Sequence, residues 1–183
     1  FGNPDLQQKI SQIWADDATG LAKAEEIARL KSVMSSEYLA EGSAASGRLL
    51  FERTCSKCHR LYGEGGTIAP DLTGSGRRKT DYVLRNLIDP SAEIDEAYKL
   101  TTVVTADGGL LSGFIVKQDD RWLEIRTQDA EVRLDMKDVD EIVTSKVSMM
   151  PEGMLRNLSD KDFRDLLVYL ATDEQVELPI ELE

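Results

Sequence analysis

The chain has 183 residues, of which 41% are hydrophobic and 31% are charged. These proportions are typical of a globular protein with one core, or with one core and an appended subdomain. The net charge of -12 argues against nucleic acid as a partner, because binding nucleic acid needs clustered Lys and Arg. The negative field would steer in a basic partner, although simple solubility explains the same charge equally well. No apolar run approaches the roughly 20 residues of a membrane span.

The first 45 residues are expected to form a helical extension without evident chemistry. Apolar residues at helical spacing predict one helix that opens at Pro4 and ends near Asp16, and a second over residues 21–34. Such amphipathic helices usually pack on the outside of the following domain, but a docking arm onto another domain fits the same pattern. The chain begins at Phe1 without Met, which indicates a processed protein or a piece cut from a longer one.

The most specific motif is Cys55-Ser56-Lys57-Cys58-His59, which has the C-x-x-C-H spacing of c-type haem attachment. Cysteines three apart lie on one face of a helical turn, so both sulfurs can form thioethers with one porphyrin, and His59 follows as an iron ligand. A structural zinc site needs about four ligands, and a thioredoxin-like motif needs a surrounding βαβ pattern. Both fit less well, while a surface disulfide stays open. We expect one covalent haem c with its iron, held by Cys55, Cys58 and His59.

A helix from Ser46 to Cys55 is expected to lead into this motif. Gly47 and Phe51 fall on one of its faces. A glycine and an aromatic residue four apart would allow a close crossing with another helix, followed by an aromatic contact. Generic core packing is compatible with the same role.

A glycine-rich stretch from Gly63 to Gly76 follows the motif and cannot be a stable helix. It lacks the G-x-x-x-x-G-K-[ST] pattern of a nucleotide-binding loop, so we expect a loop that wraps closely around something. A histidine ligand usually gives its second ring N–H to a carbonyl or a carboxylate. Pro70 offers a carbonyl without a competing N–H, so this part of the loop is the expected partner of His59.

Residues 98–145 are predicted to form an inserted antiparallel sheet. Before it, Thr80 is expected to cap a helix that ends at Asp89-Pro90. After residue 97 the apolar residues alternate, and Asp107-Gly108-Gly109 is typical of a hairpin turn between the first two of five strands. The favoured interpretation is a structural insert that shields one haem edge, while a role in docking a partner stays open.

The sixth iron ligand is expected to be a methionine, because the chain has no second histidine and a thioether is the next common choice. Met34 and Met136 lie in regular helix and strand patterns and are expected in cores. Met150 precedes Pro151, which forces it into an extended conformation on a rigid loop. Met150 is therefore the favoured second iron ligand beside His59, Met149 is the main alternative, and a gap-filling role stays open.

The closing helix is expected to begin after a Ser159 cap, with acidic residues in its first turn. It is the obvious partner for the helix that contains Gly47 and Phe51. The acidic tail that follows Thr172 is expected to be frayed.

Taken together, these pieces resemble a class I cytochrome c. The resemblance rests on Gly47 and Phe51, the Cys55–His59 motif, Pro70, the Met150-Pro151 loop and the closing helix. More narrowly, the chain is similar to the haem-binding domain family named for Pirellula and Verrucomicrobium. That similarity rests on residues 51–66, 69–74, 89–94 and 148–153 together with the inserted strands. It departs at Ala69, where the family more often has Gly.

The resemblance implies His59 as the proximal ligand and Met150 as the distal ligand. It also implies the C-terminal module of a longer exported protein that carries a dehydrogenase-like or helical-repeat region. The expected fold is mainly α, with a class I cytochrome c-like helical fold, a small antiparallel β-sheet insertion and an N-terminal helical extension. The expected parts are an extension at 1–45, a split domain at 46–97 and 146–173, an insert at 98–145 and an acidic tail at 174–183.

The expected function is one-electron transfer rather than catalysis. The partner would be a redox protein or a tethered dehydrogenase domain. The location would be periplasmic or otherwise extracytoplasmic, because haem is normally attached to C-x-x-C-H outside the cytoplasm. Two other hypotheses stay open. A labile methionine would make the haem a gas or peroxide sensor or a peroxidase, and an interaction role for the sheet would leave the haem largely structural.

Overall fold

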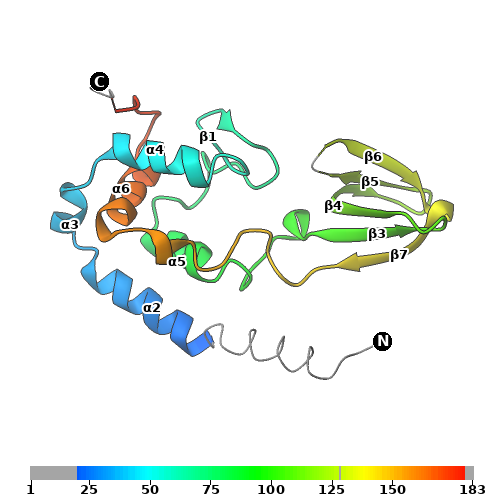
Figure 1. Ribbon diagram of the computed structural model, residues 1–183, viewed down its shortest axis with the longest axis horizontal. Helices are drawn as coiled ribbons and strands as arrows, with labels where there is room; N and C mark the ends of the chain where they lie inside the picture. Colours follow the sequence, from blue (N-terminus) through cyan, green and yellow to red (C-terminus); the bar gives the residue numbers. More distant parts are fainter. Residues whose placement is uncertain (1–19, 128, 180–183) are drawn as a thin grey trace.

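The computed structural model describes residues 20–127 and 129–179. They divide into a helical lobe and a β lobe that lie side by side along the long axis of the molecule (Figure 1). The first predicted helix and the last residues of the tail lie outside the described residues. Among the described residues, no helix is long and apolar enough to cross a membrane.

The helical lobe contains all the α-helices of the described chain. Its elements are α2 (Gly20–Val33), α3 (Ser36–Ala40), α4 (Ala44–Thr54), the short strands β1 (Arg60–Leu61) and β2 (Glu64–Gly65), α5 (Thr80–Ile88), the 3₁₀ turn η3 (Met154–Asn157), and α6 (Asp160–Ala171). The 3₁₀ turn η1 (Glu96–Tyr98) follows α5 in the chain and packs against the β lobe.

The centre of this lobe is a close crossing of α4 and α6. A Cβ at Gly47 would lie only 1.9 Å from the backbone oxygen of Asp165, so no larger residue fits without moving a helix. Phe51, one turn later, meets the ring of Tyr169 edge-on at 5.5 Å between centroids. The predicted close crossing and the predicted aromatic contact are therefore both confirmed.

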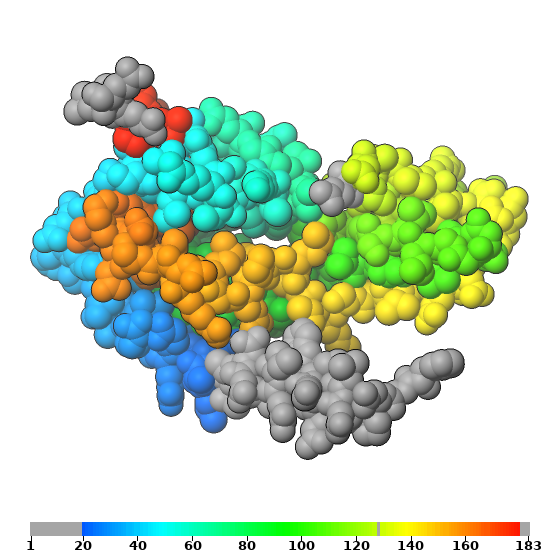
Figure 2. Space-filling view, in the orientation of Figure 1, coloured from blue at the N-terminus to red at the C-terminus, as the bar shows by residue number. Residues whose placement is uncertain are grey.

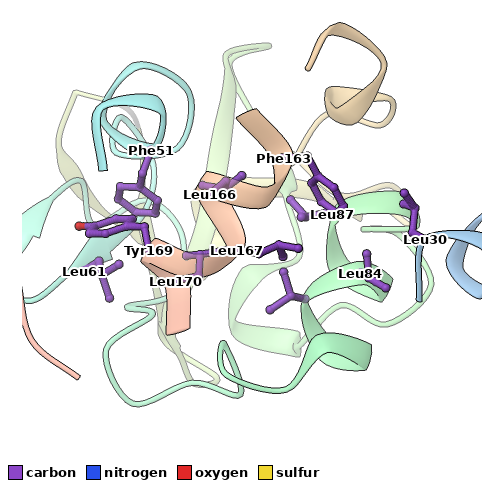
Figure 3. Close-up of a cluster of buried hydrophobic side chains, with 11 residues drawn as sticks. Leu30, Phe51, Leu61, Leu84, Leu87, Phe163, Leu166, Leu167, Tyr169 and Leu170 are labelled. Carbon is purple, nitrogen blue, oxygen red and sulfur yellow. The ribbon is translucent and has the colours of Figure 1, made fainter. Parts of the chain in front are cut away.

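One hydrophobic core joins α2, α4, α5 and α6. Figure 3 shows side chains of α6 reaching toward Phe51 on one side and toward Leu84 and Leu87 on the other. Leu30 is 7% exposed and brings α2 into the same core, and Met34 packs against its margin. The described part of the N-terminal extension thus packs on the outside of the helical lobe, as the favoured interpretation expects. The buried residues of this core are Leu30, Phe51, Leu61, Val83, Leu84, Leu87, Phe163, Leu166, Leu167, Tyr169 and Leu170.

The β lobe is an antiparallel sheet of five strands in the order β6-β5-β4-β3-β7. Gly108 takes a left-handed φ of 85° at the predicted hairpin, a conformation that favours glycine. The sheet encloses its own core around Val103, Leu123 and Ile125, each 0% exposed, and Met136 packs against it. Its elements are β3 (Thr101–Thr105), β4 (Leu110–Gln118), β5 (Trp122–Arg126), β6 (Glu131–Asp135), the 3₁₀ turn η2 (Met136–Asp138) and β7 (Val139–Thr144).

The expected fold class is wrong. The described structure is 38% helix and 21% strand, with a five-stranded sheet that has a separate hydrophobic core. It is an α+β structure with two lobes, not a mainly α class I cytochrome c-like helical fold with a small β insertion. The physical reason is the alternation of the strands, which buries one face of the sheet against itself instead of against the helices.

Two expected helix caps have different outcomes. Ser159 caps α6 as predicted, in a reciprocal capping box with Asp162. Thr80 does not cap α5, because it is already the first helical residue. Lys79 holds the extended cap position and makes no side-chain cap bond, so the helix begins one residue earlier than a Thr80 cap requires.

The expectation of a frayed tail is also wrong for residues 173–176. Val176 packs against the helical core, and its carbonyl accepts a hydrogen bond from Arg48. The Tyr169 hydroxyl donates to Gln175 at 2.8 Å, and the Gln175 amide donates to Glu64 at 2.8 Å. These contacts fold the start of the tail back onto α4 and the loop that follows it.

We expect Gly47→Ala to destabilise the holoprotein by about 3 kcal/mol, at the upper end of overpacking costs, because the new methyl group meets backbone atoms. Guanidinium unfolding measures this loss. Gly20→Ala in α2 is the matched control, since a Cβ there has nothing within 4 Å. It should be neutral or gain up to about 1 kcal/mol. Equal stability of the two variants would contradict the close crossing.

Candidate functional site

Helix α4 runs directly into the C-x-x-C-H motif. The N–H groups of Cys55 and Ser56 both donate to the carbonyl of Phe51, at 2.8 and 2.9 Å. The N–H groups of Cys58 and His59 then both donate to the carbonyl of Cys55, at 3.1 and 2.9 Å. The motif is therefore one tight turn that continues the helix, and both of its cysteines are free.

The ring of His59 is held in one orientation by a backbone carbonyl. Its Nδ1 lies 2.9 Å from the oxygen of Pro70. Because a carbonyl only accepts, Nδ1 carries the proton and Nε2 keeps a free lone pair. The N–H of Ala69 donates to the carbonyl of Cys58 at 3.0 Å, which fixes Pro70 beside the ring. The hydrogen bond expected from the sequence is present, while the part that Pro70 plays at a haem stays a prediction.

Burial sets the protonation state of this imidazole. Removal from water lowers the pKa of His59 below its ordinary value, and the hydrogen bond to Pro70 opposes this only in part. The neutral ring is the form that binds a metal. Burial also raises the pKa of the Cys55 thiol, whereas Cys58 lies at the surface.

The glycine-rich loop wraps around the backbone of the motif. The N–H of Gly66 donates to the carbonyl of Ser56 at 2.7 Å. A Cβ at Gly65 would lie 2.3 Å from the carbonyl oxygen of His59, and one at Gly66 would lie 2.3 Å from that of Lys57. These close approaches explain why glycine is needed here, and they identify what the loop encloses.

Two residues that the sequence analysis did not single out, Tyr62 and Arg77, fasten this loop to the end of α6. The Tyr62 hydroxyl donates to the carbonyl of Thr172 at 2.5 Å. Arg77 is 5% exposed and donates to the carbonyls of Leu170 and Thr172. Its guanidinium carbon lies 5.0 Å from the centre of the Tyr62 ring. No periodic pattern marks such partners, because they lie more than ninety residues apart.

The two adjacent methionines differ in their surroundings. Met150 is partly buried and packs against the helical core, whereas Met149 is 49% exposed. The N–H of Met150 donates to the Ser148 hydroxyl, and the N–H of Ser148 donates to the Ser91 hydroxyl, each at 3.1 Å. This difference favours Met150 as a ligand, and the ligand role of either residue stays a prediction.

The donor set fits a covalently attached haem. Two free thiols and an imidazole whose pKa is lowered by burial lie on one turn. In residues 20–127 and 129–179, no group of three or more His, Cys, Asp or Glu side chains is arranged to hold a metal ion, which leaves the zinc interpretation unsupported. Figure 2 shows the surface hollowed between the cyan-to-teal segment that contains the motif and the gold-to-orange segment that contains Met150.

Comparison with known families gives one informative match. The family model described as Cytochrome c matches residues 44–122, which is under half of the chain. The match is consistent with a c-type cytochrome domain and confirms that prediction. Domains of this family typically carry electrons on a covalent haem c and are usually extracytoplasmic. The matched span ends before Met150 and α6.

The other two comparisons carry no argument. No curated protein matches the sequence. Among solved structures, a crystal structure of the pleiotropic translational regulator Hfq is similar at 14% identity with a TM-score of 0.26. That similarity covers 39% of this chain and 97% of the other, and it is too low to inform either fold or function.

We expect Gly65→Ala to destabilise the holoprotein more than Gly63→Ala does. Both glycines have a positive φ, so each substitution costs about 1 kcal/mol of backbone strain. Only the Gly65 methyl group would collide with the His59 carbonyl, since a Cβ at Gly63 meets nothing within 4 Å. Gly65→Ala should therefore lose at least about 2 kcal/mol. Guanidinium unfolding followed by haem absorbance measures both, and equal losses would contradict the wrapped loop.

Proposed function

We propose that this chain is an electron-carrier domain with one haem c attached through Cys55 and Cys58, with His59 as the proximal ligand and Met150 as the distal ligand. The observation that carries the proposal is the orientation of His59. Its Nδ1 is held by the Pro70 carbonyl, which leaves the lone pair on Nε2, directly after two free thiols. This is the second-sphere arrangement that histidine ligands generally have.

A bound haem supplies the one-electron Fe(III)/Fe(II) couple. The residues of the chain orient and protect it. Pro70 holds the imidazole in one tautomer, and the loop around Gly65 and Gly66 keeps the Cys55–His59 turn closed. A thioether from Met150 would raise the potential and complete six ligands, so that no position stays open for a substrate. This arrangement suits a carrier rather than an enzyme.

We place this domain in an extracytoplasmic, periplasmic setting, as a module of a larger exported dehydrogenase-like protein. Its partner would be a tethered dehydrogenase domain or a separate redox protein. The match to the Cytochrome c family model supports the first part, because cytochrome c domains are usually extracytoplasmic. The net charge of -12 supports a partner with a basic docking face.

We expect Met150→Ala to lose the sulfur–iron charge-transfer band. Met149→Ala should keep the band, because the exposed Met149 side chain is not the proposed iron ligand. The reduced wild-type protein should bind CO poorly, and Met150→Ala should bind it readily. Visible spectra of the oxidised and CO-treated reduced proteins measure both effects.

If Met149→Ala loses the charge-transfer band and Met150→Ala keeps it, the distal ligand is Met149. Rapid CO binding together with peroxide turnover by the wild-type protein would overturn the carrier proposal. Those results would favour a sensor or peroxidase with a labile methionine.

We expect the reduced holoprotein to transfer electrons to the cation tris(1,10-phenanthroline)cobalt(III), an oxidant of high potential, several-fold more slowly when ionic strength rises from about 0.01 M to about 1 M. The Debye length shrinks from about 30 Å to about 3 Å over this range, which removes the attraction by the net negative charge. Transfer to the anion ferricyanide should speed up over the same range. Stopped-flow absorbance measures both, and an identical salt dependence for the two oxidants would contradict electrostatic steering.

A further inference from the structure

Lys23 of α2 joins two segments that are remote from it in sequence. Its Nζ lies 2.9 Å from Oδ1 of Asp89, the C-cap residue of α5, and 2.8 Å from Oε1 of Glu152. The three side chains are only 16%, 24% and 25% exposed. Such a partly buried bridge is screened less by solvent and salt than an exposed pair.

Glu152 lies two residues after Met150, so the bridge tethers the turn that carries the candidate ligand. On the other side of this turn, Ser148 is tethered to the hydroxyl of Ser91. Both tethers therefore lead to the segment of Asp89 and Ser91 that follows α5. Without Lys23, the carboxylates of Glu152 and Asp89 would lose the counterion that both of them contact, and like charges in such proximity repel.

Side-chain packing beside this bridge is incomplete. A cavity of about 350 Å³ borders Lys23 and Glu152. Both apolar and charged side chains line it, among them Leu30, Leu87 and Arg29, and no side chain of the described residues fills it. The segment after Met150 thus has open space behind it, and the ion bridge spans part of that space.

We propose that Lys23 is a positioning residue for the distal ligand. It holds the Met150-Pro151 turn against the helical lobe by neutralising Glu152 and Asp89 together. This inference rests on the proposed function, in which Met150 binds the iron. When Lys23 is removed, a larger fraction of molecules has the Met150 sulfur away from the iron, and the apparent CO affinity of the reduced protein rises with that fraction.

The test compares Lys23→Gln with Lys31→Gln in the haem-loaded protein. Lys31 is a matched control because it also joins α2 to α5, through Asp81 at 2.6 Å. That pair is 52% and 58% exposed and does not reach the Met150 turn. We expect Lys23→Gln to raise the apparent CO affinity about tenfold and to weaken the charge-transfer band. Lys31→Gln should change neither.

Two further variants separate positioning from general stability. Lys23→Arg keeps the positive charge and should restore most of the charge-transfer band. In the double variant Met150→Ala and Lys23→Gln, the CO affinity should equal that of Met150→Ala alone, because the residue that Lys23 acts through is gone. If Lys23→Gln does not fold, Glu152→Gln breaks the same tether from the turn and should give the same tenfold effect.

The inference is overturned if Lys23→Gln matches Lys31→Gln in band and CO affinity while Met150→Ala still opens the iron. It is also overturned if Lys23→Gln changes the CO affinity further in the Met150→Ala background. Failure of the proposed function looks different, because Met150→Ala itself would then leave both the band and the CO affinity unchanged.

Discussion

The contact between α4 and α6 is the constraint on which the site depends. Asp165 of α6 makes this contact twice. Its backbone oxygen leaves room only for glycine at position 47, and its carboxylate accepts the N–H of Ser43, the cap residue of α4, at 2.8 Å. Both the start and the first turn of α4 are therefore fixed by one residue of α6. Because the C-x-x-C-H turn continues α4 without a break, the same contact sets the direction in which the cysteines and His59 leave the helix.

A second contact joins the loop that follows the motif to the C-terminal end of α6. Arg77 and Tyr62 bind carbonyls at the C-terminal end of α6, so the loop after the motif returns to the helix that α4 crosses. None of the residues that make this closure belongs to the β lobe, whose strands surround a core of their own. A Tyr98–Phe114 ring contact at 6.2 Å joins it to the end of η1. The geometry of His59 is thus built within the helical lobe, and the sheet is connected to it mainly through the chain.

The features that the sequence predicts correctly are those with a local sequence signature, even where the partner is distant in the chain, as in the crossing of α4 and α6. Alternation of apolar residues places the strands, Ser159 three residues before Asp162 forms a capping box, and Gly47 before Phe51 marks the helix crossing. Thr80 shows the limit of such local rules, because Lys79 next to it can also take the cap conformation. The fold class and the roles of Tyr62 and Arg77 depend on partners distant in the chain. Alternation predicts that one face of the sheet is buried but not what covers that face, and a buried arginine at a helix end has no periodic signature.

The two candidate iron ligands are held by bonds of different kinds. His59 is fixed by the Pro70 carbonyl, eleven residues away. Both residues lie in one continuous segment, in which Gly65 and Gly66 approach the backbone of the motif closely. The turn of Met150 is fixed by side chains, through Ser91 before it and Lys23 after it. Backbone bonds within a closed loop are insensitive to movement elsewhere, whereas a bridge to Lys23 depends on where α2 lies. A displacement of α2 would therefore act directly on the methionine side of the site, whereas the hydrogen bond that holds His59 involves no residue of α2.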